Sequence, residues 1–293
     1  MNDLWQAITA RIGEATGRPW RMREQRAVGG GSINEAWRIG DGEREWFVKL
    51  NSANRVEMFA AEAEGLQALA AADAIRVPAP LDWGSHGGRS FLILEYLPLR
   101  GSPDPNDFAT ALATMHRHTA SSYGWHRDNT IGSTPQINRQ SEDWIDFWRE
   151  RRLLFQLDLA QQSGASSRLI DRGRELAERL PAFFATWTPP ASVLHGDLWS
   201  GNWGADDSGA PVIFDPAVYF GDHETDLAMM TLFGHPGRGF FERYDEVFPI
   251  DDGFSTRRTL YNLYHIINHF NLFGGGYGSQ AEGMIDQLLA ELG

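Results

Sequence analysis

The chain has 293 residues, 42% of them hydrophobic and 12% aromatic, which is enough apolar surface for one large or two medium-sized domains. It contains no cysteine, so disulfides, thiolate metal sites and cysteine nucleophiles are excluded, and its formal charge of −13 argues against binding to nucleic acid phosphates. The first residues carry no basic segment before an apolar run, and no stretch approaches about 18 uninterrupted apolar residues, so we expect a cytoplasmic protein that does not contact a membrane.

The first part of the chain predicts a small antiparallel sheet with one main helix. Residues 37–39 and 45–50 combine aromatic and β-branched side chains on either side of the turn sequence Gly40-Asp41-Gly42, a pattern typical of a hairpin. Residues 56–72 repeat apolar side chains at helical spacing. Residues 90–96 form a short apolar run that indicates a buried strand leading into a connector.

The second part of the chain predicts mostly helices. Only residues 192–194 and 211–214 have the character of strands in this half. We therefore predict an α+β fold with two lobes, a sheet-rich lobe over residues 1–98 and a larger helical lobe over residues 99–293, with a cleft between them. Helical periodicity is found in residues 107–119, 144–161, 167–186, 224–233, 256–273 and 280–292.

The strongest chemical signal is the segment 194–202, which reads Leu-His-Gly-Asp-Leu-Trp-Ser-Gly-Asn. Asp197 is followed five positions later by Asn202, and Asp215 ends the next apolar strand. This is the catalytic-loop pattern of kinases, in which the first Asp accepts the proton of the substrate hydroxyl while the Asn and the second Asp hold Mg²⁺. A polar loop with a capping Asp is the alternative, but it does not account for the second Asp. We predict Asp197 as the catalytic residue and Asn202 and Asp215 as metal ligands.

Lys49 and Glu62 are the predicted phosphate-binding pair. Lys49 lies in a predicted strand and Glu62 on the helix that follows, and kinases hold the α- and β-phosphates of ATP with such a lysine, braced by a carboxylate from that helix. An exposed lysine is the alternative for Lys49. Glu57 and Glu64 are the alternatives for the carboxylate, and helix phase favours Glu62.

A glycine-rich segment at residues 29–36 precedes the first hairpin strand. Gly30, Gly31 and Ser32 could bring backbone amides close to phosphates, although the segment is neither a Walker A loop nor a complete protein-kinase glycine loop. A flexible turn is the alternative.

Glu95, Tyr96 and Leu97 end the last predicted strand of the first lobe. This is where a hinge between lobes would place backbone groups against adenine, and a plain strand end is the alternative. His116 and His118 do not form a metal pair, because residues two apart point to different faces of a helix.

Together these motifs resemble the fructosamine kinase (ketosamine-3-kinase) family, itself similar to aminoglycoside and choline phosphotransferases. The resemblance covers nearly the whole chain and is carried by residues 47–49, 58–59 with Glu62, 77–80, 194–202, 214–217 and 268–274. It implies a protein-kinase-like fold and the ATP- and Mg²⁺-dependent phosphorylation of the 3-hydroxyl of ketosamines, which are sugar adducts of free or protein amines. This would be a deglycation repair activity.

The resemblance also implies details of the substrate side. Trp199 is expected to form a wall for the sugar, with a core tryptophan as the alternative, and residues 125–140 resemble the substrate-side region of the family. Some members carry a cysteine in the glycine-rich loop that supports redox-controlled dimerisation; Ser32 stands at that place, so we expect no such switch and a monomer. A kinase for an aminoglycoside, choline or homoserine, or a catalytically inactive binding protein with a kinase fold, are the competing hypotheses.

Overall fold

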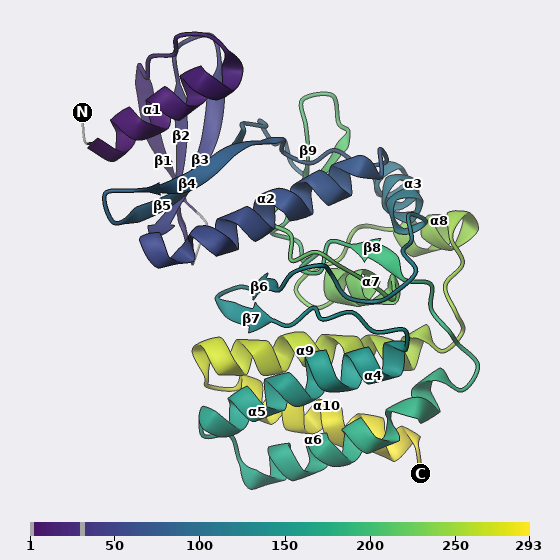
Figure 1. Ribbon diagram of the computed structural model, residues 1–293. Helices are drawn as coiled ribbons and strands as arrows, with labels where there is room; N and C mark the ends of the chain where they lie inside the picture. Colours follow the sequence, from purple (N-terminus) through teal and green to yellow (C-terminus); the bar gives the residue numbers. More distant parts are fainter. Residues whose placement is uncertain (1–2, 30–32) are drawn as a thin grey trace.

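The computed structural model describes residues 3–29 and 33–293, and it contains a five-stranded antiparallel sheet followed by a larger, mostly helical region (Figure 1). The sheet has the strand order β1-β2-β3-β5-β4. The predicted hairpin corresponds to β2 and β3, and the predicted buried strand to β5. The strands are β1 (Glu24–Val28), β2 (Glu35–Gly40), β3 (Glu45–Ser52), β4 (Pro80–His86) and β5 (Arg89–Glu95).

Two helices cover opposite faces of this sheet. Helix α1 (Asp3–Thr16) packs Ile8 and its neighbours against one face, and α2 (Val56–Ala71) packs Phe59 and its neighbours against the other (Figure 1). Because α2 also contacts the helical region, it joins the two parts of the molecule through one shared core.

The alternation of side chains along β3 decides where Lys49 points. Val48 and Leu50 lie in the core beneath α1. Successive residues of a strand face opposite sides of the sheet, so Lys49 faces α2. Its cross-strand neighbour Leu92 packs into the core on the same α2 side.

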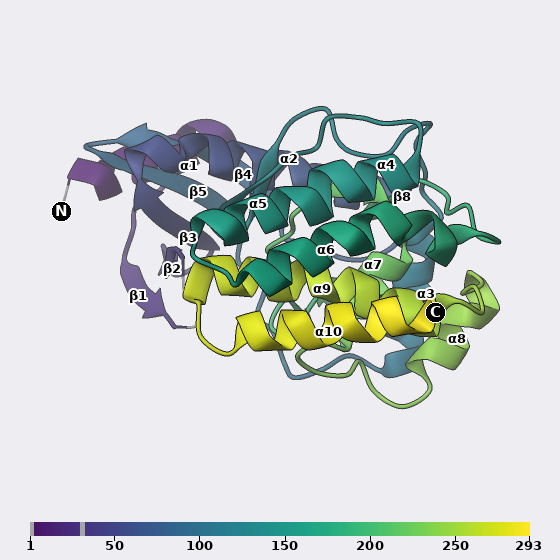
Figure 2. The same ribbon diagram turned by 90° about the horizontal axis from the view of Figure 1, so that it is seen from below.

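The rest of the chain is built mainly from helices. Four of them, α5, α6, α9 and α10, lie side by side at the end of the molecule farthest from the sheet (Figures 1 and 2). Within the described residues, no helix is long and apolar enough to cross a bilayer. The helices are α3 (Pro105–His116), α4 (Trp144–Trp148), α5 (Leu154–Gln162), α6 (Ser167–Arg179), α7 (Glu224–Met230), α8 (Phe240–Val247), α9 (Phe254–Phe273) and α10 (Tyr277–Glu291).

Three short strand pairs lie between the sheet and these helices. Each strand has three residues, and each pair is antiparallel. The pair β8–β11 leads into the catalytic-loop motif, and the pair β9–β10 follows it. The pairs are β6 (Asn129–Ile131) with β7 (Thr134–Gln136), β9 (Trp203–Ala205) with β10 (Pro211–Ile213), and β11 (Tyr219–Gly221) with β8 (Ser192–Leu194).

The predicted α+β fold and its main elements are confirmed, but the sequence did not predict β1, β4 or α8, and two further expectations need correction. The expectation of only two strands in the second half is wrong, because β6, β7, β9 and β11 are also present. Strands of three residues are too short to show a period of two. The sheet is also covered by a second helix, α1, in addition to the predicted main helix.

Candidate active site

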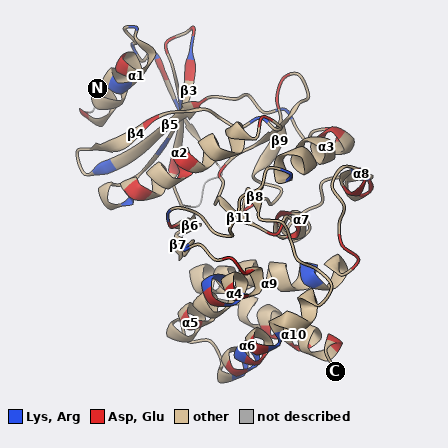
Figure 3. Cartoon of the chain, turned by 45° about the vertical axis from the view of Figure 1, so that its right-hand side comes forward, with Lys and Arg blue, Asp and Glu red and all other residues tan. Residues whose placement is uncertain are grey.

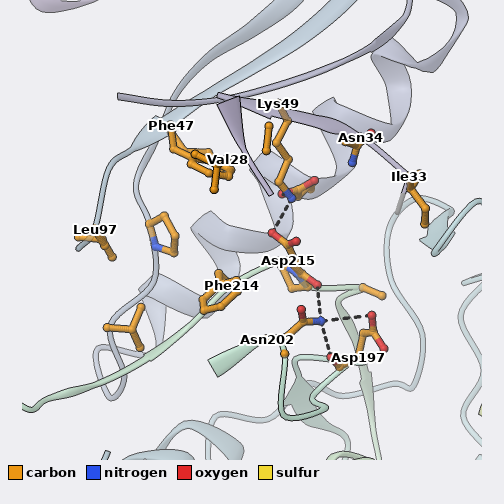
Figure 4. A pocket seen from close by; sticks show the side chains of 18 of the residues that line it. Val28, Ile33, Asn34, Phe47, Lys49, Leu97, Asp197, Asn202, Phe214 and Asp215 are labelled. Atoms are coloured by element: carbon orange, nitrogen blue, oxygen red, sulfur yellow. Dashed lines mark hydrogen bonds and ion pairs between the residues drawn. The ribbon is translucent and has the colours of Figure 1, made fainter. Parts of the chain in front are cut away.

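A cavity of about 720 Å³ lies between the sheet and the helical region (Figure 4). Its lining comes from β2, β3, α2, the segment after β5 and the loops around β9 and β10. It brings together every predicted site residue that the structure describes; Gly30, Gly31 and Ser32 lie outside the described residues, and Gly29 and Ile33 beside them line the cavity. The predicted residues in its wall are Lys49, Glu62, Glu95, Tyr96, Leu97, Asp197, Trp199, Asn202 and Asp215.

Lys49 is held between two carboxylates. Its Nζ atom lies 2.6 Å from Oε1 of Glu62 and 2.5 Å from Oδ1 of Asp215, and only 4% of the residue is exposed (Figure 4). Burial alone favours the neutral amine, but the charges of Asp215 and Glu62 outweigh it and hold the pKa of Lys49 above its ordinary value. Lys49 is therefore an ammonium ion in this site.

The two glutamates that competed with Glu62 point elsewhere. Glu57 and Glu64 both pair with Arg127, at 2.8 and 2.6 Å, and Glu64 also contacts His126. These contacts fasten α2 to the helical region. They leave Glu62 as the glutamate of α2 that faces Lys49.

The ring of His195 connects the two acidic segments of the site. The backbone amide of Asp197 donates to Nδ1 of His195 at 3.2 Å, which requires the proton of a neutral ring to be on Nε2. Nε2 then donates to the carbonyl of Phe214 at 2.9 Å. Burial lowers the pKa of His195 and so favours this neutral form.

Gly196 is required by the shape of the same turn. Its φ of +81° lies in the left-handed region, and a Cβ at this position would overlap the carbonyl oxygen of Ala217. The backbone of Ala217 approaches so closely because its amide donates to the carbonyl of His195 at 2.8 Å. A glycine between His195 and Asp197 therefore lets the two loop segments lie against each other.

Asp226 of α7 also supports this turn, and the sequence did not single it out. The buried carboxylate accepts the backbone amides of His195 at 2.7 Å and Gly196 at 2.8 Å. It also contacts Nε2 of the buried His116 at 3.1 Å. Burial alone would raise the pKa of Asp226, but the hydrogen bond and charge of His116, with further contacts, lower it, so the carboxylate is charged. Its sequence signal was weak, because Asp226 is one of two acids in the first turn of α7 and nothing in the sequence distinguishes it from Glu224.

Asp197 and Asn202 contact each other across the catalytic loop. Nδ2 of Asn202 donates to the backbone carbonyl of Asp197 at 2.8 Å and lies 3.3 Å from Oδ2 of the same residue (Figure 4). Burial, together with the charge of Asp215, raises the pKa of Asp197 to about 7, although the hydrogen bond from Asn202 opposes this shift. Asp197 is thus a stronger base than an ordinary aspartate.

Asn202 and Asp215 fit a magnesium site. Because Nδ2 of Asn202 is used by Asp197, the free oxygen Oδ1 is the atom that can coordinate a cation. Asp215, with a left-handed φ of 59°, has a half-exposed carboxylate beside it in the cavity. The described residues contain no group of three or more acidic or histidine side chains placed to hold a metal by themselves. Two hard oxygen ligands completed by phosphate and water oxygens are typical of Mg²⁺ bound with a nucleotide.

The sequence pattern of the family described as fructosamine kinase matches residues 4–291 of this chain. The chain belongs to the fructosamine kinase family. It is 45% identical over 288 residues to a Synechocystis sp. protein named as a probable ketoamine kinase, covering 97% of each chain. It is 42% identical over 298 residues to a chloroplastic protein-ribulosamine 3-kinase of Oryza sativa, covering 98% of this chain and 87% of that one.

Solved structures agree with this membership. A Haemophilus somnus protein assigned to the fructosamine-3-kinases superposes with a TM-score of 0.89 at 30% identity, covering 97% of both chains. An ADP-bound aminoglycoside phosphotransferase superposes with a TM-score of 0.63 at 13% identity over 98% of this chain and 96% of that one, which shows the shared protein-kinase-like fold alone.

The predicted hinge of this fructosamine kinase family member has free backbone groups. The side chain of Glu95 is occupied by Arg76 at 3.0 Å and by the amide of Ala79 at 3.3 Å. Leu97 lines the cavity, and its backbone amide and carbonyl have no hydrogen-bond partner among residues 3–29 and 33–293. A planar, polar ring edge could bind there.

Trp199 lies at the open side of the cavity, with 38% of the residue exposed. The alternative of a core tryptophan is therefore wrong. Its indole covers Gly201, where an added Cβ would overlap the ring. Asn129, Thr130 and Gly132, from the region resembling the substrate side of the family, line the same cavity.

Proposed function

We propose that the protein is a ketosamine 3-kinase, which transfers the γ-phosphoryl group of ATP to the 3-hydroxyl of a sugar–amine adduct. One observation carries this proposal. In a fructosamine kinase family member, the carboxylate of Asp197 shares a single cavity with Asn202, Asp215 and the Lys49–Glu62 ion pair. Phosphoryl transfer depends on positioning and on charge neutralisation, and these are the groups that supply both.

Asp197 is the proposed general base. In the transfer, the bond from the γ-phosphorus to its bridging oxygen breaks, a bond from the 3-oxygen of the sugar to phosphorus forms, and the hydroxyl proton passes to Asp197. Lys49, fixed by Glu62, binds the α- and β-phosphates, and Asn202 and Asp215 hold Mg²⁺. The cation would neutralise charge between the phosphates.

The remaining contacts to the nucleotide are assigned to the hinge and to the glycine-rich segment. We propose that backbone groups of Leu97 bind adenine and that Gly30, Gly31 and Ser32 cover the phosphates. In this proposal, residues 1–98 form the nucleotide-binding lobe and residues 99–293 carry the catalytic loop and the substrate site. The free backbone groups of Leu97 support the first of these contacts.

The charges of the cavity favour a compact polyol over a polycationic aminoglycoside. Among the described residues that line the cavity, Glu62 and Asp215 pair with Lys49, and Glu95 pairs with Arg76. Asp197 is the carboxylate that remains without a cation. Several ammonium groups would need several unpaired carboxylates, and the only unpaired one is the proposed base, so the described lining does not suit a polycationic substrate.

A substrate panel tests the proposal. The purified protein is assayed with ATP and Mg²⁺ against ribuloselysine, fructoselysine, kanamycin, choline and homoserine, and kcat/KM is measured for each. We expect one of the two ketosamines to give the highest value and kanamycin to give no useful turnover. If kanamycin or choline exceeds both ketosamines, the proposed substrate class is wrong; if no substrate is phosphorylated and ATP is not consumed, the kinase mechanism is wrong as well.

A further inference from the structure

Lysine is almost absent from this protein. Of its 26 Lys and Arg residues, Lys49 is the only lysine. All the other blue segments in Figure 3 are therefore arginines, including those on the outer helices and at the edge of the sheet. The chain has one side-chain amine.

Ion pairing with carboxylates does not explain why arginine stands in place of lysine at every position. Arg18, Arg21, Arg23 and Arg26 are exposed near the edge strand β1, and none has an ion pair among the described residues. A lysine would supply the same charge at such positions, since the planar guanidinium is needed where it binds two oxygens or stacks on a ring. At these exposed positions, arginine and lysine differ mainly in the chemical reactivity of their side chains.

Amines and guanidinium groups differ in their reaction with reducing sugars. The lone pair of a neutral amine attacks the aldehyde carbon to form a carbinolamine, which loses water to give a Schiff base and then rearranges to a ketosamine. This first bond requires an unprotonated nitrogen. Arginine keeps its proton at all physiological pH values, whereas an exposed lysine always has a small neutral fraction.

Lys49 is shielded from this reaction. Its Nζ contacts the carboxylates of Glu62 and Asp215, and the residue is almost fully buried. The two carboxylates enclose the nitrogen, so a sugar aldehyde can reach it only if this buried ion pair breaks. A sugar that enters the cavity meets an ammonium ion already bound on two sides.

We propose that the protein is itself resistant to glycation: no lysine side chain presents a reactive amine to a reducing sugar. The exposed cationic surface is made of arginine, and the single lysine is held as an ion pair inside the nucleotide-binding cavity. The inference goes beyond the proposed function, because it concerns covalent change to this chain and not the substrate that it phosphorylates. It predicts that no lysine side chain of the protein becomes a ketosamine where reducing sugars are abundant.

Incubation with D-ribose tests the proposal. The purified protein is kept with excess ribose at neutral pH without nucleotide, and peptide mapping by mass spectrometry follows the adducts at each amine. The control variants are Arg21→Lys and Arg18→Lys, each of which adds one exposed amine at unchanged charge. We expect the introduced amine to gain a ribose adduct at least about tenfold faster than Lys49, because reaction at Lys49 would first have to break a buried ion pair.

Two outcomes decide the matter. Adducts confined to the α-amine of the first residue and to the introduced lysine support the proposal. A ribose adduct on Lys49 at a rate comparable to that of the introduced lysine overturns it. Later addition of ATP and Mg²⁺ to glycated Arg21→Lys protein reports separately on the proposed kinase activity, because removal of that adduct requires phosphorylation whereas the resistance of Lys49 does not.

Discussion

The carboxylate of Asp226 accepts the backbone amide of Gly196 at 2.8 Å, although the two residues are 30 positions apart. The same carboxylate accepts the amide of His195, so two donors of the catalytic turn end on one buried side chain of α7. Asp197 is the next residue of the chain after Gly196. The position of the proposed base is therefore set by a residue that does not line the cavity, and Asp226 is a positioning residue.

Replacing Asp226 by Asn should impair catalysis and stability together. A neutral amide offers one acceptor oxygen to two backbone donors and removes the charge that faces His116. We expect kcat to fall on the order of 10²-fold, the usual effect of a displaced catalytic group, with the KM for ATP little changed. The free energy of unfolding should fall by about 1.5–3 kcal/mol, the range for hydrogen bonds to a charged group.

Steady-state kinetics and urea unfolding measure these two effects. Asp171→Asn on the exposed side of α6 is the matched control and should change neither quantity. Unchanged kcat in a folded Asp226→Asn protein would mean that Asp226 does not position the loop.

Gly196→Ala should be more harmful than an alanine at another left-handed glycine. Gly196 and Gly209 have φ values of +81° and +87°, but only at Gly196 would the new Cβ overlap a neighbouring atom, the carbonyl oxygen of Ala217. The left-handed conformation alone costs roughly 1–2 kcal/mol. We expect Gly209→Ala to lose about that much unfolding free energy and to keep its activity, whereas Gly196→Ala should lose more and also lose kcat. Equal losses of stability in the two variants would show that the close approach of Ala217 is unimportant.

The sequence predicted those parts of the site whose residues form short motifs along the chain. Asp197 and Asn202 lie within one short motif, and Asp215 follows the next strand, so spacing was sufficient to recognise them. Lys49 was predicted from the kinase pattern of a lysine in a strand, and Glu62 from helix phase; the two side chains form the ion pair in the structure. Contacts between residues far apart along the chain could not be predicted from the sequence.

Asp226 and β1 show what the sequence could not predict. Asp226 binds backbone amides, and every residue except proline has one, so the sequence does not indicate which amides it binds. The two residues are also 30 positions apart, so no short motif contains both. All residues of β1 are exposed, so no apolar alternation marks this edge strand, which is held in the sheet by pairing with β2.

Asp197→Asn should remove the proposed base while keeping the size of the side chain. We expect kcat to fall by at least about 10²-fold, the usual scale for loss of a general base, with the affinity for ATP little changed. Turnover of a ketosamine and calorimetric titration with ATP measure the two quantities. Near-normal turnover in the purified variant would exclude Asp197 as the base.

Asp215→Ala should abolish the part of nucleotide binding that depends on magnesium. A carboxylate supplies charge that a methyl group cannot replace, and Asn202 alone offers one neutral oxygen. Calorimetric titrations of ATP with and without Mg²⁺ measure this difference. Asp207→Ala, which breaks an exposed ion pair with Arg100, is the control and should bind MgATP normally. If the magnesium dependence of Asp215→Ala equals that of the unchanged protein, Asp215 is not the metal ligand.

Trp199→Ala should weaken binding of the sugar without affecting the nucleotide. The exposed indole lines the cavity near Asp197, where an aromatic face can cover the apolar side of a sugar, and its loss should raise the KM for a ketosamine roughly tenfold. Gly201→Ala tests the same wall from beneath, because the added methyl group would push the indole out of its position. Gly283→Ala adds a methyl group into open space on α10 and should leave both KM values unchanged.

The expected result is a raised KM for the ketosamine and an unchanged KM for ATP in both Trp199→Ala and Gly201→Ala. If both variants keep the normal KM for the ketosamine, the indole does not form part of the sugar site, and the substrate must bind along another wall of the cavity.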